Sequence, residues 1–306
     1  MTTIPSIVCV GTVALDMILT ADRLPPEDGR VEADQVALVG GGNAANAAVA
    51  IARLGLPVEF CGTIGDDRAG GLLLDELIAE GVGTSLVERR RGSVTAQTAV
   101  IVSSGTGART IITRPAPPPP AIPRGFDITH LDKAGWGAMP REGVAGTRVS
   151  VDDGNLIPDL DLALLEWYVP TATVLRSRYG TTSIEAARRA RLDGAATVIA
   201  TDGARGSFAV DDSGLHFAPA LPITPVSTLG AGDVFHGALV AAIALGRPMA
   251  AAIRFANVTA ALSCRALDGR TGIPDRAEVD ALVGALGDPR LSDREIAARF
   301  SNEDPA

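Results

Sequence analysis

The sequence predicts an α/β protein built on a mostly parallel sheet that helices cover on both faces. Short β-rich runs alternate with longer Ala/Leu-rich segments, as where 6–11 precedes 43–55 and 58–65 precedes 69–81. Both of these helical segments end at a glycine, which is a common helix terminator. Strands that alternate with helices of this length favour right-handed βαβ units.

The second half of the chain continues this alternation. The run 196–203, "ATVIATDG", is β-rich and ends in a turn. Further along, apolar segments predict helices around 231–246 and 248–267. The parallel sheet is therefore expected to extend through both halves of the chain.

Two segments lack the α/β pattern. Residues 17–39 show no helical period, and 95–113 consist of two β-rich runs joined across 104–107, which is typical of a hairpin. We expect both segments to form a small accessory sheet over the main one. Because the edge of such a sheet can pair with a second copy, this sheet also predicts a homodimer. The proline-rich stretch 114–124 is expected to be a stiff connector back to the main domain.

These observations divide the chain into a main domain, a lid and a tail. The charged tail is expected to be a peripheral helix or a frayed end. The expected ranges are 1–16, 40–94 and 114–290 for the main α/β domain, 17–39 and 95–113 for the β lid, and 291–306 for the C-terminal tail.

Composition and charge exclude several classes of function. The 306 residues are 46% hydrophobic and carry a formal net charge of −9, which disfavours nucleic acid and membrane surfaces as partners. No segment approaches the ~18 consecutive apolar residues of a membrane span, and the N-terminus reads as a first strand, not a signal peptide. The three cysteines, Cys9, Cys61 and Cys264, stand far apart and suit a reducing cytoplasm.

Lysine usage excludes two large classes of ATP-dependent enzyme. Lys133 is the only lysine in the sequence. Walker-type ATPases need a lysine in GxxxxGK[ST], and protein kinases need one on a strand. The sequence provides a lysine in neither context.

The stretch 227–246, "STLGAGDVFHGALVAAIALG", predicts a phosphoryl-transfer site. Gly230, Ala231 and Gly232 precede a long apolar helix, whose first N–H groups lack intrahelical partners and attract anions. Asp233 follows in the first turn, where an acid also simply stabilises a helix by about 0.3–1 kcal/mol. That stability does not explain the glycines, which weaken a helix start unless a ligand must approach. We therefore expect the amides to bind a phosphoryl group and Asp233 to act as a base.

A second stretch, 40–55, "GGGNAANAAVAIARLG", predicts a polyol site. Its glycines lead into an Ala-rich helix, with Asn43 and Asn46 at the helix start. Asp16 follows the first strand region, at the sheet edge where α/β proteins bind ligands. Since each sugar hydroxyl is both donor and acceptor, carboxylates and amides suit its recognition.

Three motifs together resemble the PfkB/ribokinase family of sugar kinases. These are 40–55, "GTIGDDRAG" at 62–70, and 227–246, and the similarity spans residues 5 to about 285. Within that family the sequence is most similar to the sulfofructose-kinase and ketohexokinase side. The resemblance implies a ribokinase-like three-layer α/β/α sandwich with a small β-sheet lid, often paired with a partner's lid in a dimer. It also implies transfer of the ATP γ-phosphate to a sugar hydroxyl with Mg²⁺.

The resemblance also implies roles for individual residues. Asp233 would be the base, and 230–232 the anion hole. The implied sugar-binding residues are Asp16, Gly41, Gly42, Asn46 and, in "ITHLDK", Asp132. The implied nucleotide-binding residues are Thr201, Gly203 and Gly206 in "TDGARG", with Asn257 and Gly272 beside the adenine.

The sequence departs from the family pattern at two places that concern cations. Ser227 replaces the first Asp of DTxGAGD, so a monovalent-cation site is left open. The family's NxxE glutamate, which organises Mg²⁺ through water, is missing near 174–182, and Asp153 and Asn155 are the remaining candidates for water-mediated Mg²⁺ contacts. Arg30 lies in the lid stretch, where a cation would serve an anionic sugar, but no sulfonated substrate is predicted.

Two alternatives to a sugar kinase remain open from the sequence. A nucleoside kinase would use the same scaffold, although few aromatic residues are available near the lid to stack on a base. A catalytically weak sugar-binding regulator would be compatible with the missing glutamate. The three histidines are interpreted as structural, with His236 packed in its helix and His130 and His216 isolated.

Overall fold

The centre of the molecule is a sheet ordered β14-β13-β12-β11-β10-β9-β1-β4. It is seen in a computed structural model that describes residues 4–105, 109–285 and 291–301. The strands from β4 to β12 pair in parallel, and β13 and β14 add an antiparallel hairpin at one edge. The strands are β1 (Ile7–Val10), β4 (Glu59–Cys61), β9 (Ile128–Leu131), β10 (Arg148–Asp153), β11 (Trp167–Pro170), β12 (Thr197–Thr201), β13 (Ser207–Asp211) and β14 (Gly214–Ala218).

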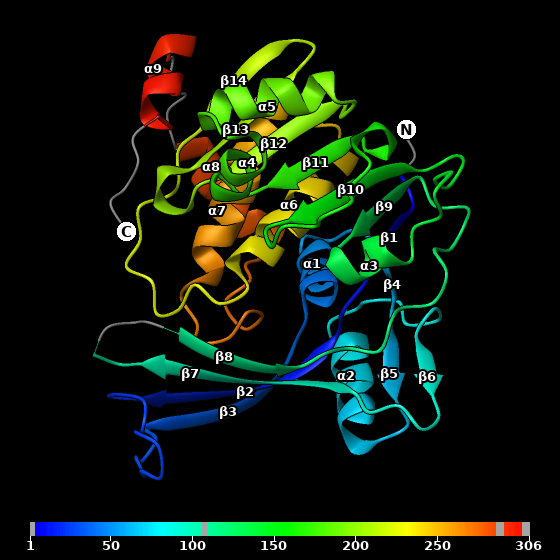
Figure 1. The fold of residues 1–306 in the computed structure, drawn as a ribbon, viewed down its shortest axis with the longest axis vertical. Coiled ribbons are helices and arrows are strands. Elements are labelled where there is room, and N and C mark those ends of the chain that lie inside the picture. Colours follow the sequence, from blue (N-terminus) through cyan, green and yellow to red (C-terminus); the bar gives the residue numbers. More distant parts are fainter. Residues whose placement is uncertain (1–3, 106–108, 286–290, 302–306) are drawn as a thin grey trace.

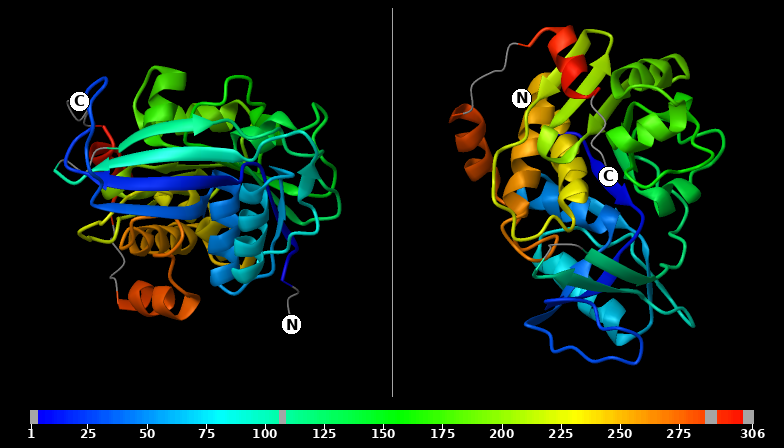
Figure 2. Two further views of the ribbon diagram at one scale, coloured as in Figure 1. Left: turned by 90° about the horizontal axis from the view of Figure 1, so that it is seen from below. Right: turned by 60° about the vertical axis from the view of Figure 1, so that its left-hand side comes forward.

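Helices cover both faces of this sheet, which makes three layers (Figures 1 and 2). Alternate residues of β1 show the division, since Ile7 and Cys9 belong to one apolar core and Val8 and Val10 to the other. Helices α1 (Asn43–Arg53), α2 (Arg68–Ala79), α6 (Ala231–Ala244), α7 (Met249–Ser263) and α8 (Arg276–Ala285) contribute to the first core. On the other face lie α3 (Lys133–Gly137), α4 (Ala172–Tyr179), α5 (Ser183–Leu192) and α9 (Asp293–Arg299), with short 3₁₀ turns at Leu162–Leu164 and Gly203–Arg205.

A separate sheet, ordered β3-β2-β7-β8, forms the lid. Its strands are β2 (Ala14–Ala21), β3 (Gln35–Gly41), β7 (Ala96–Ser103) and β8 (Arg109–Arg114). Because β1 ends at Val10 and β2 begins at Ala14, this sheet lies beneath the edge where the parallel strands end (Figure 1). Its inner residues Ile18 and Val100 pack with Leu229, just before α6. The lid therefore closes over the carboxyl end of the main sheet.

The lid strands extend beyond the predicted segments at both of their main-domain junctions. β2 starts three residues before position 17, and β3 continues to Gly41, so that Asp16 and Gly41 are lid-strand residues. The antiparallel pairing of β7 with β8 agrees with the expected hairpin, although residues 106–108 of its turn lie outside the described part. The division into domains stays a prediction.

Smaller elements complete the fold. β5 (Thr63–Gly65) and β6 (Glu88–Arg90) form a two-stranded sheet beside α2. In the tail, α9 buries Ile296, and Phe300 packs against Phe208 and Phe217. Residues 302–306 of the predicted tail lie outside the described residues. Within the described ranges, no helix has the length and apolar character needed to cross a membrane.

Candidate functional site

A cavity of about 300 Å³ lies between the lid and the carboxyl end of the main sheet. In open α/β sheets this edge is where ligands bind. Helices α1 and α6 and the lid strand β2 supply polar groups, and the lid strands β7 and β8 add further side chains. The lining residues are Thr12, Ala14, Asp16, Gly42, Asn43, Asn46, Ala96, Thr98, Val100, Ile111, Thr113, Arg114, Ala116, Asn155, Leu229, Gly230, Asp233 and Gly269.

Helix α6 begins at this cavity. Gly230 is its N-cap with φ of 74°, and a side chain there would come within 2.7 Å of the Gly269 Cα, so only glycine fits without strain. Within the described residues, the amides of Gly230 and Gly232 donate to no protein acceptor, whereas the Ala231 amide donates to the Thr228 carbonyl at 3.3 Å. Two of the three predicted anion-binding amides are thus unengaged, and the third makes only a long hydrogen bond.

Asp233 faces the cavity from the first turn of α6. Its Oδ2 accepts a hydrogen bond of 2.8 Å from Asn46 Nδ2. Burial raises the pKa of Asp233 to about 7, and the charge of Asp152 adds to this effect, while the Asn46 hydrogen bond and His236 oppose it. Protein atoms surround the Asp233 carboxyl on the sides away from the cavity, and the residue is half-exposed where it lines the cavity. It is therefore placed to exchange a proton with a ligand near neutral pH.

Asp16 projects into the same cavity from β2. Gly41 leaves room for it, because a Cβ at that position would collide with the Asp16 carboxylate. Burial raises the pKa of Asp16 to about 6, against the opposing effects of a Thr98 hydrogen bond and the Arg270 charge. Gly42, the N-cap of α1, lines the cavity beside them. Five predicted residues, Asp16, Gly41, Gly42, Asn46 and Asp233, thus come together around one cavity.

A buried polar cluster lies behind this site. Asp152 accepts hydrogen bonds from Asn43 at 3.3 Å and from the Gly154 amide at 2.8 Å, and its Oδ1 lies 3.0 Å from His236 Nε2. Burial alone would lower the pKa of His236, but the Asp152 carboxylate outweighs it and raises that pKa. The His236 ring lies beside that of His130, at 5.4 Å between centroids. The sequence interpretation of His130 as isolated is therefore wrong, whereas the interpretation of His236 as packed agrees with the structure. His216 is not isolated either, since its Nε2 lies 3.0 Å from Asp211 Oδ1.

Of the predicted sugar-binding residues, Gly41 adjoins Asp16 without lining the cavity, and Asp132 and Arg30 do not line it either. Asp132 is buried, and its carboxylate accepts hydrogen bonds from the amides of Thr12, Ala44 and Gly135. It caps α3 and ties that helix to the loop after β1. Arg30 is exposed in the loop between β2 and β3. In this structure neither Asp132 nor Arg30 is positioned to contact a ligand in the cavity.

The predicted nucleotide-binding residues lie further along the same sheet edge. Thr201 at the end of β12 is opposite Ser207, which in turn pairs with Ala218 at the end of β14. Gly206 adjoins the Ala218 carbonyl, and Asn257 donates to it at 2.9 Å. Gly203 lies in the intervening turn, and Gly272 packs against the Ser263 carbonyl at the end of α7. All five positions therefore surround the ends of β12, β14 and α7.

The two predicted Mg²⁺ contacts differ in their surroundings. Asp153 is fully buried and accepts hydrogen bonds from Tyr168 at 2.7 Å, Arg178 at 3.0 Å and the Ile157 amide at 2.6 Å. It has a structural role and faces away from ligands. Asn155 is exposed and lines the cavity. Across the described ranges, no three His, Cys, Asp or Glu side chains are grouped to hold a metal ion.

Several lining residues were not predicted from the sequence. Thr98, Thr113 and Arg114 come from β7 and β8, which carry no recognisable ligand motif. Arg270 was also missed, although it donates to Asn46 from the loop after α7. Its position in "DGRTGIPD" gave no signal, because its partner is 224 residues away in the chain.

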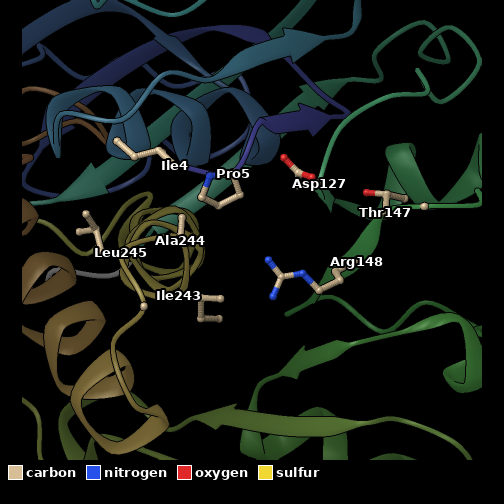
Figure 3. Close-up of a pocket in the computed structure, with 10 residues that line it drawn as sticks. Ile4, Pro5, Asp127, Thr147, Arg148, Ile243, Ala244 and Leu245 are labelled. Carbon is tan, nitrogen blue, oxygen red and sulfur yellow. The ribbon is translucent and has the colours of Figure 1, made fainter. Parts of the chain in front are cut away.

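A larger cavity of about 780 Å³ lies at the opposite edge of the sheet (Figure 3). Ile4 and Pro5 precede β1, and Arg148 begins β10, so this cavity adjoins the amino ends of the strands. Its charged groups are engaged elsewhere. Asp127 accepts two hydrogen bonds from Ser6, and the Arg148 guanidinium lies 5.1 Å from the Trp167 ring centre. None of the predicted site residues lines this cavity, although the last four residues of the 227–246 stretch do.

Known proteins similar to this chain include sugar kinases and, among solved structures, a nucleoside kinase of Burkholderia thailandensis in complex with inosine, with a TM-score of 0.79 at 23% identity, covering 92% of this chain and 96% of that one. The family model described as "pfkB family carbohydrate kinase" matches residues 4–118 and 164–276. A ribokinase of Bacillus subtilis is 29% identical over 91% of this chain and 99% of its own, and a ketohexokinase of Mus musculus is 26% identical over 87% and 98%. The solved structure of an Arabidopsis thaliana ribokinase complexed with ribose and ATP has a TM-score of 0.77 at 25% identity, covering 92% of this chain and 99% of that one. The chain therefore belongs to the pfkB family of carbohydrate kinases and is a kinase with the ribokinase fold.

Proposed function

We propose that this kinase transfers the γ-phosphate of ATP to a hydroxyl group of a ketose or a related sugar. The observation that carries the proposal is the pairing of Asp233 with Asn46 at a cavity that also exposes Asp16 and Asn43. These side chains supply acceptors and donors for several hydroxyls at once. The solved relative that binds ribose and ATP has the same fold, which supports ATP as the donor.

Asp233 acts as the general base in this proposal. The acceptor hydroxyl gives its proton to the Asp233 carboxylate while the hydroxyl oxygen bonds to the γ-phosphorus of ATP. The bond between that phosphorus and the β–γ bridging oxygen breaks, which releases ADP. The transition state of phosphoryl transfer is loose, and negative charge is spread over the equatorial oxygens of the transferred phosphoryl group. The free amides of Gly230 and Gly232, at the positive end of α6, face that charge.

Mg²⁺ enters with ATP as part of the substrate. Such ions are held mainly by phosphate oxygens and water, with one or two side chains, and they neutralise charge on the transferred group. Of the two predicted contacts, Asn155 lines the cavity, whereas the Asp153 carboxylate accepts hydrogen bonds from Ile157 and Tyr168. The sugar itself contacts Asp16, Asn43 and Asn46, while Thr201, Gly203, Gly206, Asn257 and Gly272 border the nucleotide.

A sugar suits the cavity better than a nucleoside does. Among the described residues that line it, none is aromatic, whereas stacking of a base on aromatic rings contributes about 1–3 kcal/mol. The volume of about 300 Å³ is at the lower end of ligand cavities. Both features favour a compact, hydroxyl-rich acceptor.

We also propose that two copies pair through their lid sheets. On the outer face, Leu38, Met17, Ala99 and Ile112 are neighbours in register across the four strands. Leu38 is 61% exposed and Ile112 is 66% exposed, and such an apolar row across a whole sheet is typical of a self-complementary interface.

Release of ADP in the presence of different acceptors tests the sugar-kinase proposal. The protein is incubated with Mg²⁺-ATP and ketoses, aldoses, sugar acids and nucleosides in parallel. We expect a ketose or a close relative to give the highest kcat/KM. A higher kcat/KM for nucleosides, or ADP release that no acceptor stimulates, would contradict it.

A further inference from the structure

Arg270 is a buried cation that contacts the sugar side of the site without lining the cavity. Only 5% of its surface is exposed. Its Nε donates to Asn46 Oδ1 at 2.8 Å, its Nη2 donates to the Gly41 carbonyl at 3.0 Å, and its Nη1 lies 3.4 Å from Glu76 Oε2. The guanidinium thus connects the end of β3, helix α1 and helix α2 through one rigid group.

The contact with Asn46 fixes the orientation of its side-chain amide. A guanidinium has donors only, so the Asn46 atom that faces it must be the carbonyl oxygen. The NH₂ group then faces the other way, where it donates to Asp233 at 2.8 Å. Without Arg270 the amide could turn over, and its oxygen would then face the Asp233 carboxylate. Arg270 therefore reinforces the orientation in which the Asn46 NH₂ group meets the base.

The same loop is itself held in place. The Asp268 carboxylate accepts hydrogen bonds from the Arg270 amide at 2.7 Å and the Thr271 amide at 2.6 Å. Arg53, at the end of α1, donates to the Arg270 carbonyl at 2.7 Å and to the Ile273 carbonyl at 3.1 Å. Since these contacts fix the backbone, the Arg270 guanidinium is preorganised to donate to Asn46 and Gly41.

We propose that Arg270 is a positioning residue of the phosphoryl-transfer site, which orients the Asn46 amide towards Asp233 and holds the Gly41 turn for the sugar. This inference rests on the proposed function, because it takes Asp233 as the base. Arg270 touches neither substrate nor the reacting atoms, and it acts through Asn46.

The charge of Arg270 also affects the carboxylates around it. The Asp16 carboxyl is held at a lower pKa than burial alone would give, partly by Arg270. Loss of this cation, together with loss of the oriented Asn46 donor, is expected to raise the pKa of Asp233. The charged groups that face Arg270 are Asp16, Glu76, Glu80 and Asp233, and those that face Asp233 are Asp132, Asp152, His236 and Arg270.

Substitutions at position 270 separate the effect of the positive charge from that of the planar guanidinium donors. Arg270→Gln removes both, and we expect kcat/KM for the sugar to fall by about 10- to 100-fold, the size of a lost charge-assisted hydrogen bond. We also expect the acidic limb of the pH profile to move upward. Arg270→Lys keeps the charge without the planar guanidinium donors, so that it should lose activity while leaving the limb near its wild-type pH.

A double-mutant cycle tests whether Arg270 acts through Asn46. In an Asn46→Ala background, Arg270→Gln should cost less than about 3-fold, because the amide that Arg270 orients is already gone. Arg53→Gln is the matched control. It removes an arginine of α1 that holds the same loop through its backbone carbonyls, and we expect a lower melting temperature with an unchanged acidic limb of the pH profile.

The outcomes distinguish this inference from the proposed function. Full additivity with Asn46→Ala, or an equal effect of Arg53→Gln on the pH profile, would mean that Arg270 only stabilises the loop and would overturn the inference. Wild-type kcat/KM in a folded Arg270→Gln variant would overturn it too. If Asp233→Asn also retained full activity, the proposed function itself would fail instead.

Discussion

The Asn46 side-chain amide lies 2.8 Å from the Asp233 carboxylate, although 187 residues separate the two in the chain. Asn46 lies in the first turn of α1, which follows the lid strand β3, and Asp233 lies in the first turn of α6. The contact therefore joins the proposed sugar side of the cavity to the proposed phosphoryl side. The hydrogen bond from Asn46 lowers the pKa of Asp233 and so opposes the effect of burial, which keeps that pKa at about 7.

The pH dependence of activity should follow Asp233. Because its pKa is about 7 and the base must be ionised, kcat/KM for the sugar should fall about tenfold per pH unit below that value. Initial rates between pH 5 and 9 measure this limb. Asp16→Asn, which removes the neighbouring carboxyl with a pKa of about 6, should leave the limb in place. If Asp16→Asn shifted the acidic limb, the limb would report the titration of Asp16 and not of Asp233.

Removal of the base should stabilise the protein at neutral pH. The folded-state pKa of Asp233 is about 7 against an ordinary value of 3.8, so the folded protein keeps this proton between those pH values after the unfolded chain has lost it. The free energy of unfolding contributed by this group therefore falls as pH rises through that window. Urea denaturation should show Asp233→Asn roughly 1–2 kcal/mol more stable at pH 8, after allowance for solvent screening, and equal to wild type at pH 4. Asp159→Asn, at an exposed position, is the control. An equal gain in the free energy of unfolding in that variant would show that the effect does not come from the raised pKa of Asp233.

Alanine at Gly230 should damage both stability and turnover. The positive φ of 74° costs about 1–2 kcal/mol for any side chain, and the new Cβ would press on Gly269 at 2.7 Å. Gly246 is a matched control, because it has the same φ of 74° but open space around its missing side chain. Thermal unfolding should show a loss in both variants, whereas kcat/KM should fall only in Gly230→Ala. Equal kinetics for the two variants would contradict the role given to the start of α6.

The lid interface predicts a change in mass on substitution. Glutamate in place of Ile112, at one end of the apolar row, should leave a buried charge in the dimer and convert it to a monomer. Light scattering after size-exclusion chromatography measures the mass directly. Leu192→Glu, on the exposed face of α5 with 87% of Leu192 accessible, should leave the mass unchanged. A monomeric wild-type protein would rule out the proposed pairing.

Much of the site could be predicted from local sequence, because backbone chemistry fixes it. Gly230 and Gly232 signal an exposed helix start, Asn46 belongs to a helix start after a glycine run, and Asp16 comes soon after β1. The role of Asp132 could not be read this way. It directly follows β9, but the nearby amides of Thr12 and Gly135 satisfy its carboxylate. Whether a carboxylate binds a ligand or the chain depends on contacts between distant segments.

The same limit applies to the buried charges. Asp153 lies beside the cavity residue Asn155 in sequence, yet Tyr168 and Arg178 surround it in the structure. Arg270 shows the opposite case, since an ordinary loop arginine proves to contact the central amide of the site. Neither outcome follows from residue type or spacing, because both depend on how separate helices pack.

Turnover by Asp233→Asn at pH 8, with the best sugar acceptor at saturation, tests the role of Asp233 as the base most directly. We expect a kcat lower by about 10²–10⁴-fold, with sugar binding retained in calorimetry. A folded variant whose kcat stays within threefold of wild type would show that this carboxylate does not accept the hydroxyl proton.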